Sequence, residues 1–253
     1  LASEGRGGRP LGGALAAPPP RATYRLQFHK GFKFDDAAAI VPYLARLGIS
    51  HLYSSPIQTA RPGSMHGYDI VDHGAINPEL GGEHGFDRLA AVLKAHGMGL
   101  VLDIVPNHMA AGGADNPWWL ALLEWGELSP AARVFDVDWE RLGAEGKIVL
   151  PFLGDRYGDA LEKGTLELRF DPVDGSFSVH HYEHRFPLSP LSYPLVLDRA
   201  LAALDTAREV PAVGRLLDAS ERLRSMALAQ APDRRAAHPA ECEAIKADIV
   251  AAI

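Results

Sequence analysis

Residues 101–110 read VLDIVPNHMA, an apolar strand that carries a carboxylate and ends on an amide and an imidazole. A carboxylate at the end of a buried strand needs an ion pair or a hydrogen-bond donor. Taken alone, Asp103 fits a structural ion pair, and Asn107 and His108 fit satisfied loop side chains. The alternative is that these three residues form part of a polar site beyond the strand.

Strand and helix patterns alternate on the N-terminal side of this stretch. TYRLQF (23–28), ISHLYSS (49–55) and MGLVLDIVP (98–106) are typical of strands. Apolar residues recur at helical spacing in two segments between them. The first is expected to begin near Asp35 and Asp36, to be kinked or delayed by Pro42, and to end at Gly48. The second contains Phe86, Leu89, Ala90 and Leu93, and residues 57–82 are expected to form a long loop.

This order indicates an α/β fold with a parallel sheet covered on both faces, either a doubly wound sheet or a (β/α)8 TIM barrel. In both folds the active site lies at the carboxyl ends of the strands. Polar residues gather at those ends in this sequence: Gln27, His29, Ser54, Ser55, Asp103, Asn107 and His108.

The alternation stops after His108. KIVLPFL (147–153), TLELRF (165–170) and SFSVHHY (176–182) predict antiparallel strands, and DPVDG joins the last two. From Tyr193 the chain is predicted to be helical, with a break near Ala231 and Pro232 and a last helix from about Ala240. The expected organisation is a flexible tail (1–21), the first part of a barrel (22–108), an inserted α+β subdomain (109–190) and a helical insertion (191–253).

All four tryptophans lie within residues 117–139. For Trp118 and Trp119 the core of a small subdomain is the favoured interpretation, and for Trp125 and Trp139 core and sugar contact stay open. His180, His181 and His184 resemble a zinc cluster, but neighbours on a strand point to opposite faces, so no zinc site is expected.

The composition excludes several classes. A net charge of -7 argues against nucleic acid or an anionic membrane as the main partner. No apolar run approaches the ~20 residues of a membrane span. Cys242 is the single cysteine, so no internal disulfide can form, which suits the cytoplasm. Residues 1–20 lack a sustained apolar segment and are therefore expected to be a tail rather than an export signal.

Several motifs together resemble a known superfamily. DIVPNH (103–108), beside HGYDIVDHGAINPELGG (66–82) and LYSSP (52–56), resembles the α-amylase superfamily, whose members are retaining glycosidases and transglycosidases built on a (β/α)8 barrel. NPWWL (116–120) and YEHRFPLSP (182–190) resemble, within glycoside hydrolase family 13, the maltooligosyltrehalose synthases. The resemblance covers about residues 22–192.

The resemblance implies an intramolecular transglycosidase that converts the terminal α-1,4 bond of a maltooligosaccharide, derived from starch or glycogen, into an α,α-1,1 bond. It implies that Tyr68 stacks on the sugar in the -1 subsite and that His108 bonds its 6-hydroxyl. Asp103 would hold an arginine that orients the nucleophile, and Asp69 and His66 would line the same pocket.

The resemblance implies no cofactor. Asn107 is a calcium ligand in many amylases and is the candidate metal ligand here, but the maltooligosyltrehalose synthases are not characteristically calcium-dependent. No metal is therefore expected.

The catalytic carboxylates that the resemblance implies are not found in this sequence. The pattern Gly-x-Arg-x-Asp around the nucleophile does not occur, and three of eight barrel strands are recognised. The nucleophilic Asp, the acid/base Glu and the arginine for Asp103 are therefore expected beyond residue 253, and Glu124, Asp136 and Asp138 are not assigned to these roles. The chain is expected to be an N-terminal portion that needs the remainder of the same enzyme to complete its barrel.

Two alternatives remain open. One is an amylase-type α-glucan hydrolase or a 4-α-glucanotransferase. The other is a non-catalytic glucan-binding fragment.

Overall fold

A computed structural model describes residues 19–141, 147–203, 210–228 and 232–253. The expected flexible tail, residues 1–21, lies almost wholly outside the described residues. The chain divides into two compact units, unit 1 (1–110) and unit 2 (111–253), each described separately below.

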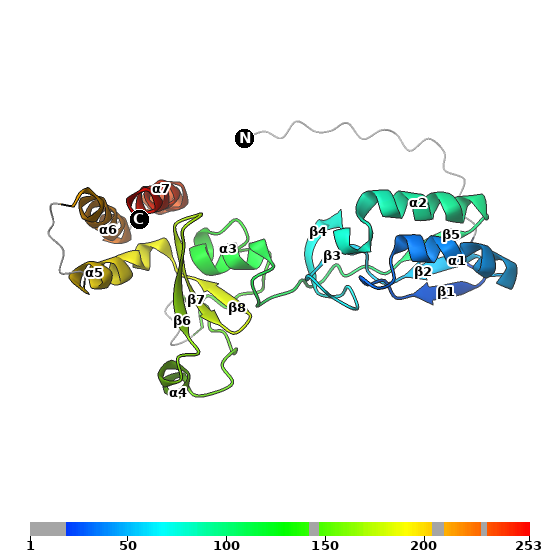
Figure 1. The fold of residues 1–253 in the computed structure, drawn as a ribbon, viewed down its shortest axis with the longest axis horizontal. Helices are drawn as coiled ribbons and strands as arrows, with labels where there is room; N and C mark the ends of the chain where they lie inside the picture. Colours follow the sequence, from blue (N-terminus) through cyan, green and yellow to red (C-terminus); the bar gives the residue numbers. More distant parts are fainter. Residues whose placement is uncertain (1–18, 142–146, 204–209, 229–231) are drawn as a thin grey trace. The chain divides into compact units, whose positions relative to one another are not determined.

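Unit 1 is built on a three-stranded parallel sheet in the order β1-β2-β5 (Figure 1). The strands are β1 (Thr23–Leu26), β2 (His51–Ser54) and β5 (Gly99–Leu102). Arg25 pairs in register with Tyr53, which pairs with Val101. The three predicted strands and their parallel direction are confirmed.

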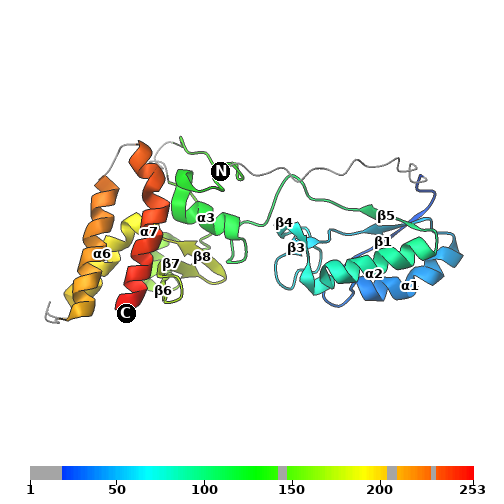
Figure 2. The ribbon, with the colours of Figure 1, turned by 90° about the horizontal axis from the view of Figure 1, so that it is seen from above.

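Two helices cover one face of this sheet, α1 (Phe34–Leu47) and α2 (Gly82–Ala95) (Figure 2). Phe28, Phe34, Leu44 and Leu52 are fully buried between the helices and the sheet. Each such side chain contributes about 1.5–3 kcal/mol relative to an exposed one. This layer is the hydrophobic core of unit 1.

The ends of α1 follow local chemistry. The Lys33 backbone N–H donates to Asp36 Oδ2 at 2.8 Å, and Gly48 ends the helix with φ +89°. The expected helix end at Gly48 is confirmed. The expected late start caused by Pro42 is wrong, because the helix begins at Phe34 and continues through Pro42.

The opposite face of the sheet is open in the described part of unit 1. Arg25 is exposed on this face, and Tyr53 and Val101, which lie beside it across the sheet, are partly exposed. The expectation of a sheet covered on both faces is therefore wrong for this chain, since α1 and α2 both pack on the same face.

The expected loop over residues 57–82 contains regular structure. β3 (Gln58–Ala60) and β4 (Ile70–Ile76) form an antiparallel pair, followed by the short 3-10 helix η1 (Pro78–Leu80). The prediction of a plain loop is wrong. The many Gly and His residues suggested a loop, whereas Ile70, Val71 and Ile76 pack their side chains inward and form β4.

Unit 2 contains an antiparallel sheet, β6 (Glu167–Asp171), β7 (Ser176–His181) and β8 (His184–Pro187). The first two confirm the predicted pair joined by DPVDG, and β8 was not predicted. The predicted strand over 147–153 is wrong, because this segment has no regular structure. Ile148 and Leu150 instead pack against the small core around Trp119.

Helices complete unit 2: α3 (Pro117–Trp125), η2 (Gly126–Leu128), α4 (Tyr157–Glu162), η3 (Pro190–Ser192), α5 (Tyr193–Ala203), α6 (Pro211–Leu228) and α7 (Pro232–Ala252). Phe177 of the sheet packs with Tyr193, Leu223 and Ile249 of these helices. The last helix begins at Pro232 rather than near Ala240, because Pro at the first helical turn is compatible with a helix. None of the described helices is long and apolar enough to cross a membrane.

The tryptophans divide between core and surface. Trp119 is 9% exposed and belongs to the core, as predicted, whereas Trp118 is 45% exposed, so the core prediction is wrong for it. Trp139 packs against the Trp119 cluster, and Trp125 packs against the core shared with the helices.

Candidate functional site

The open face of the unit 1 sheet collects polar side chains because residues alternate between the two faces of a strand. Leu26 and Leu52 face the helices, so Arg25 and Tyr53 face the opposite side. Asp103 immediately follows β5, and its N–H donates to the Ser54 carbonyl at 3.2 Å, which continues the ladder. By the same alternation, Asp103 lies on the face of Val101 and Arg25.

The loop before β4 brings Tyr68 to this face. Gly67 adopts φ +76°, and a Cβ there would lie 2.8 Å from the Pro56 carbonyl oxygen, so the turn needs glycine. Ser64 Oγ accepts from the Gly67 N–H at 3.1 Å and donates to Asp69 Oδ1 at 2.5 Å. Asp69 thus holds the turn that presents Tyr68.

Three side chains meet at the site. Tyr68 Oη donates a hydrogen bond to Asp103 Oδ2. Arg25 Nη2 donates to Tyr68 Oη at 2.9 Å and lies 3.4 Å from Asp103 Oδ2. We refer to Arg25, Tyr68 and Asp103 as the site triad. The side chains of Arg25 and Asp103 are 37% and 18% exposed, so the triad faces solvent in part.

The site triad adds a residue that the sequence analysis did not name. Asp103 forms an ion pair with Arg25 of this chain, and the nucleophile-orienting arginine expected beyond residue 253 stays a prediction. Arg25 was missed because TYRLQF looks like an ordinary strand with a surface arginine. The signal that could have found it is its parity: Arg25 shares the strand face of Gln27, one of the polar strand-end residues.

The carboxylate also sets the protonation of the phenol. The hydrogen bond donated to Asp103 raises the pKa of Tyr68 above its ordinary value of about 10, with burial as a second cause. Arg25 acts in the opposite direction. Tyr68 is therefore a neutral hydrogen-bond donor at physiological pH.

His66 lies beside the triad. Its ring is stacked near the Tyr68 ring, with centroids 6.1 Å apart and an interplanar angle of 26°. The Tyr68 N–H donates to His66 Nδ1 at 3.0 Å, and the same atom lies 3.7 Å from Asp69 Oδ1. These contacts join His66, Tyr68 and Asp69 to Asp103 in one cluster.

His108 and Asn107 are exposed and contact each other, with His108 Nδ1 3.2 Å from Asn107 Oδ1. Within the hydrogen bonds and ring contacts of the described residues, neither is joined to the site triad. The pairing of His108 with Tyr68 on one sugar stays a prediction, and so does the expectation that Asn107 holds no calcium. Groups of three or more His, Cys, Asp or Glu able to hold a metal are absent from the described ranges.

Other strand-end polar residues have structural partners. Ser55 Oγ accepts from the Phe28 N–H at 2.8 Å, and His29 Nδ1 accepts from the Gly31 N–H at 3.0 Å. In unit 2, His181 and His184 contact the Thr165 carbonyl and the Gly113 N–H at 3.0 and 2.9 Å. These contacts account for the four side chains without any ligand.

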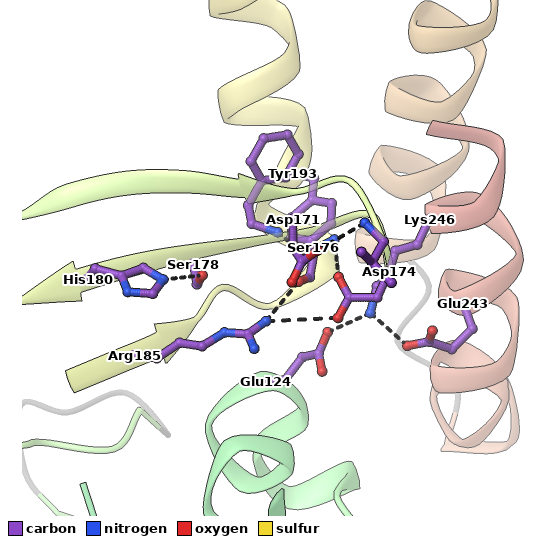
Figure 3. A network of polar contacts seen from close by, with 12 residues as sticks. Glu124, Asp171, Asp174, Ser176, Ser178, His180, Arg185, Tyr193, Glu243 and Lys246 are labelled. Atoms are coloured by element: carbon purple, nitrogen blue, oxygen red, sulfur yellow. Dashed lines mark hydrogen bonds and ion pairs between the residues drawn. The ribbon is translucent and has the colours of Figure 1, made fainter. Parts of the chain in front are cut away.

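Figure 3 shows where the carboxylate of Glu124 lies in unit 2. Lys246 is 4% exposed, and its Nζ lies 3.1 Å from Glu124 Oε1 and 3.0 Å from Glu243 Oε1. Burial raises the pKa of Glu124 although Lys246 opposes this change. Glu124 therefore serves an internal ion pair.

Comparison with known proteins supports the class of the fold. The family described as α-amylase, catalytic domain, matches residues 38–118. A putative maltooligosyl trehalose synthase of Mycobacterium tuberculosis is 44% identical over 183 residues, covering 66% of this chain and 24% of that protein. The chain thus spans about a quarter of the length of this curated relative.

Two solved structures are also similar. Maltooligosyltrehalose synthase from Arthrobacter ramosus is 43% identical with a TM-score of 0.58, covering 67% of this chain and 21% of that one. A hypothetical maltooligosyl trehalose synthase of Sulfolobus tokodaii is 35% identical with a TM-score of 0.58, covering 73% of this chain and 24% of that one.

The parallel sheet with helices between its strands is an α/β fold, and residues 38–118 of the chain match the α-amylase catalytic domain. Within that superfamily, the chain is related to the maltooligosyltrehalose synthases over about two thirds of its length. The resemblance seen in the sequence is thereby confirmed for this part of the chain.

Proposed function

We propose that this chain supplies the sugar-binding wall of an intramolecular transglycosidase of the maltooligosyltrehalose synthase type. The whole protein would convert the reducing-end α-1,4 bond of a maltooligosaccharide into an α,α-1,1 bond. Unit 1 would be the first three β/α units of a (β/α)8 barrel. Residues 109–190 would form the inserted subdomain, and residues 191–253 a helical insertion.

The observation that carries the proposal is the contact of Tyr68 with Asp103 beyond the carboxyl end of the parallel sheet. Active sites of such α/β folds lie at this edge. The Tyr68 ring is partly exposed, and aromatic faces suit the apolar face of a pyranose ring. A fixed, partly exposed ring next to a carboxylate is suited to hold one glucose unit.

The remaining roles follow from this placement. His108 would donate to the 6-hydroxyl of the same glucose, and His66 and Asp69 would complete the wall around it. Retaining transfer needs two carboxyl groups about 5 Å apart, one as nucleophile and one as acid/base. The Gly-x-Arg-x-Asp pattern is absent from this sequence, so we assign both groups to segments of the whole protein beyond residue 253.

The chemistry explains why binding groups matter in such a reaction. The transition state resembles an oxocarbenium ion, so contacts that tighten on the flattened sugar accelerate transfer by differential binding. A rearrangement must also keep water from the glycosyl-enzyme intermediate while the freed glucose turns. A segment that covers the bound sugar would serve this purpose.

The proposal is tested in two steps with maltopentaose as substrate. The 253-residue chain alone should bind it without converting it, and conversion by this chain would overturn the assignment of the carboxylates. The whole protein should yield a non-reducing product. New reducing ends would indicate a hydrolase, and longer chains a glucanotransferase.

A substitution locates the effect. Tyr68→Ala in the whole protein should lower kcat/KM by at least about tenfold, as expected when a stacked aromatic contact is lost. Tyr43→Ala is the matched control, since Tyr43 is 57% exposed on α1. Equal activity of the two variants would contradict the role of Tyr68.

A further inference from the structure

Arg25 contacts four side chains although its own side chain is partly exposed. Its Nη2 donates to Tyr68 Oη at 2.9 Å and faces Asp103 at 3.4 Å. Its Nη1 donates to Gln27 Oε1 at 3.0 Å, and its guanidinium carbon lies 5.3 Å from the centroid of the Tyr53 ring. Both terminal nitrogens of the guanidinium therefore have partners, and one face has a ring.

Gln27 extends these contacts to the backbone of the Tyr68 loop. Its Nε2 donates to the carbonyls of Met65 and His66 at 3.3 and 3.0 Å. Arg25 therefore reaches the phenol hydroxyl directly and the loop backbone through Gln27. Arg25 of β1 thus holds the hydroxyl of Tyr68, 43 residues away in the sequence, and Gln27, just after β1, holds the loop that precedes it.

We propose that Arg25 is a positioning residue that fixes the Tyr68 ring, with Gln27 as its link to the loop, in the orientation that receives a glucose unit. Arg25 acts through Tyr68, so it is not assigned a contact with substrate. This inference rests on the proposed function only for the identity of the sugar. The fixing of the ring is a property of unit 1 itself.

The type of residue matters. A guanidinium is planar and presents its donors in a fixed fork, so it can bond Tyr68, Asp103 and Gln27 at once while stacking on Tyr53. A lysine ammonium would keep the charge beside Asp103 but lacks the fork and the flat face. Arg25→Lys therefore separates charge from geometry.

The ionisation of Tyr68 distinguishes positioning from mere proximity of charge. The Asp103 hydrogen bond raises the pKa of Tyr68, and Arg25 lowers it. If Arg25 were only a nearby cation, its removal would raise this pKa further. If Arg25 holds the ring against Asp103, its removal breaks that hydrogen bond, and the pKa falls toward the ordinary value of about 10.

The experiment is a phenolate absorbance titration of the 253-residue chain. The chain contains seven tyrosines. The titration curve of Tyr68 alone is therefore obtained by subtracting the curve of each protein's Tyr68→Phe variant from the curve of that protein. Arg25→Met and Arg25→Lys should both lower the Tyr68 pKa. Arg88→Met is the control. Arg88 makes a bidentate bond to exposed Asp35, at 2.9 and 2.8 Å, elsewhere in unit 1. The control should leave the Tyr68 pKa unchanged.

A raised Tyr68 pKa in Arg25→Met would overturn the proposal, and so would full recovery by Arg25→Lys. Circular dichroism and melting of each variant identify any protein that fails to fold. If Arg25→Met does so, Gln27→Met, which keeps the guanidinium but removes its link to the loop, provides the test. It should lower the Tyr68 pKa in the same direction, and an unchanged value would overturn the role of the link.

Maltopentaose affinity is measured on the same proteins. Arg25→Met should weaken binding by about tenfold, the size expected when a hydrogen bond that orders a contacting group is lost. If the unsubstituted chain does not bind maltopentaose, the proposed function fails, while the titration still decides the role of Arg25. If it binds and Arg25→Met binds equally well, the positioning role fails alone.

Discussion

The hydroxyl of Tyr68 donates a hydrogen bond to the carboxylate of Asp103, which joins the loop before β4 to the end of β5 across 35 residues of sequence. The contact lies at the carboxyl edge of the parallel sheet, where ligands of this fold class bind. It brings together a ring and a carboxylate for which the family resemblance implies a role in sugar binding. Three predictions concern this pair and the turn before it, and two concern buried groups of unit 2.

The first prediction concerns the coupling between these two side chains. In a double-mutant cycle, Tyr68→Phe and Asp103→Asn should each destabilise unit 1, and their effects should not add. The interaction energy should be about 1 kcal/mol, as for a typical hydrogen bond between partly exposed groups. Urea unfolding of the four proteins provides the measurement, and strictly additive effects would show that the contact contributes nothing.

The same pair predicts a pH dependence. The pKa of Tyr68 is higher in the folded chain than in the unfolded one, so the unfolded state loses this proton first as pH rises. The contribution of Tyr68 to stability is complete below about pH 10 and is lost as pH rises through the folded pKa. Tyr68→Phe should therefore flatten the fall in unfolding free energy above pH 10, and an identical fall in both proteins would contradict the raised pKa.

The second prediction concerns the turn that presents Tyr68. Gly67→Ala should destabilise unit 1 by more than about 2 kcal/mol and weaken maltopentaose binding, because a Cβ would lie 2.8 Å from the Pro56 carbonyl oxygen. Gly63→Ala is the matched control. Gly63 has a similar φ of +79°, but the nearest neighbour of its Cβ, Lys30 Nζ, is 3.8 Å away, so it should cost only about 1 kcal/mol. Equal losses in the two variants would refute the steric argument.

The third prediction concerns the buried ion pair of unit 2. Lys246→Met should cost about 3–5 kcal/mol, because it leaves the Glu124 carboxylate, 16% exposed, without its cation. Adding Glu124→Leu should restore most of that loss. Lys163→Met, which removes an exposed bond to Asp155, should have little effect on stability, because solvent screens this pair. If Lys246→Met costs as little as Lys163→Met, the pair has no structural role.

The fourth prediction concerns Cys242. The side chain is fully buried, and burial raises the pKa of its thiol to about 12. Because the thiolate is the reactive form, iodoacetamide at pH 8 should not modify the native chain and should modify it in denaturant. Rapid modification without denaturant would show that α7 detaches from the core of unit 2.

Local patterns were sufficient for much of the fold. The strands at Thr23–Leu26 and His51–Ser54 were predictable because they are short runs on either side of a helix whose end at Gly48 could be recognised in the sequence. The hairpin of β6 and β7 was legible from DPVDG. The strand predicted at 147–153 failed, because an apolar run there packs its side chains around Trp119 without pairing its backbone.

Most residues of the candidate site could be predicted from the sequence, but the contact of Asp103 with Arg25 could not. Tyr68, Asp69, His66 and Asp103 could be named from their motifs, and the contacts among them exist. Arg25 could not be named, because its partners lie 43 and 78 residues away. His108 was also predicted to bind the sugar. In the structure it contacts Asn107, and its sugar contact stays a prediction.

The sequence by itself determined the α/β class of unit 1, because the alternation of strand and helix is a local property of the chain, and its motifs carried the resemblance to the α-amylase superfamily. Only the tertiary structure decided that Arg25 faces Tyr68 and Asp103, and that Glu124 is committed to Lys246. The physical reason is that an ion pair or hydrogen bond depends on sheet register and helix packing, which bring distant residues within 3–4 Å and leave no trace in local spacing.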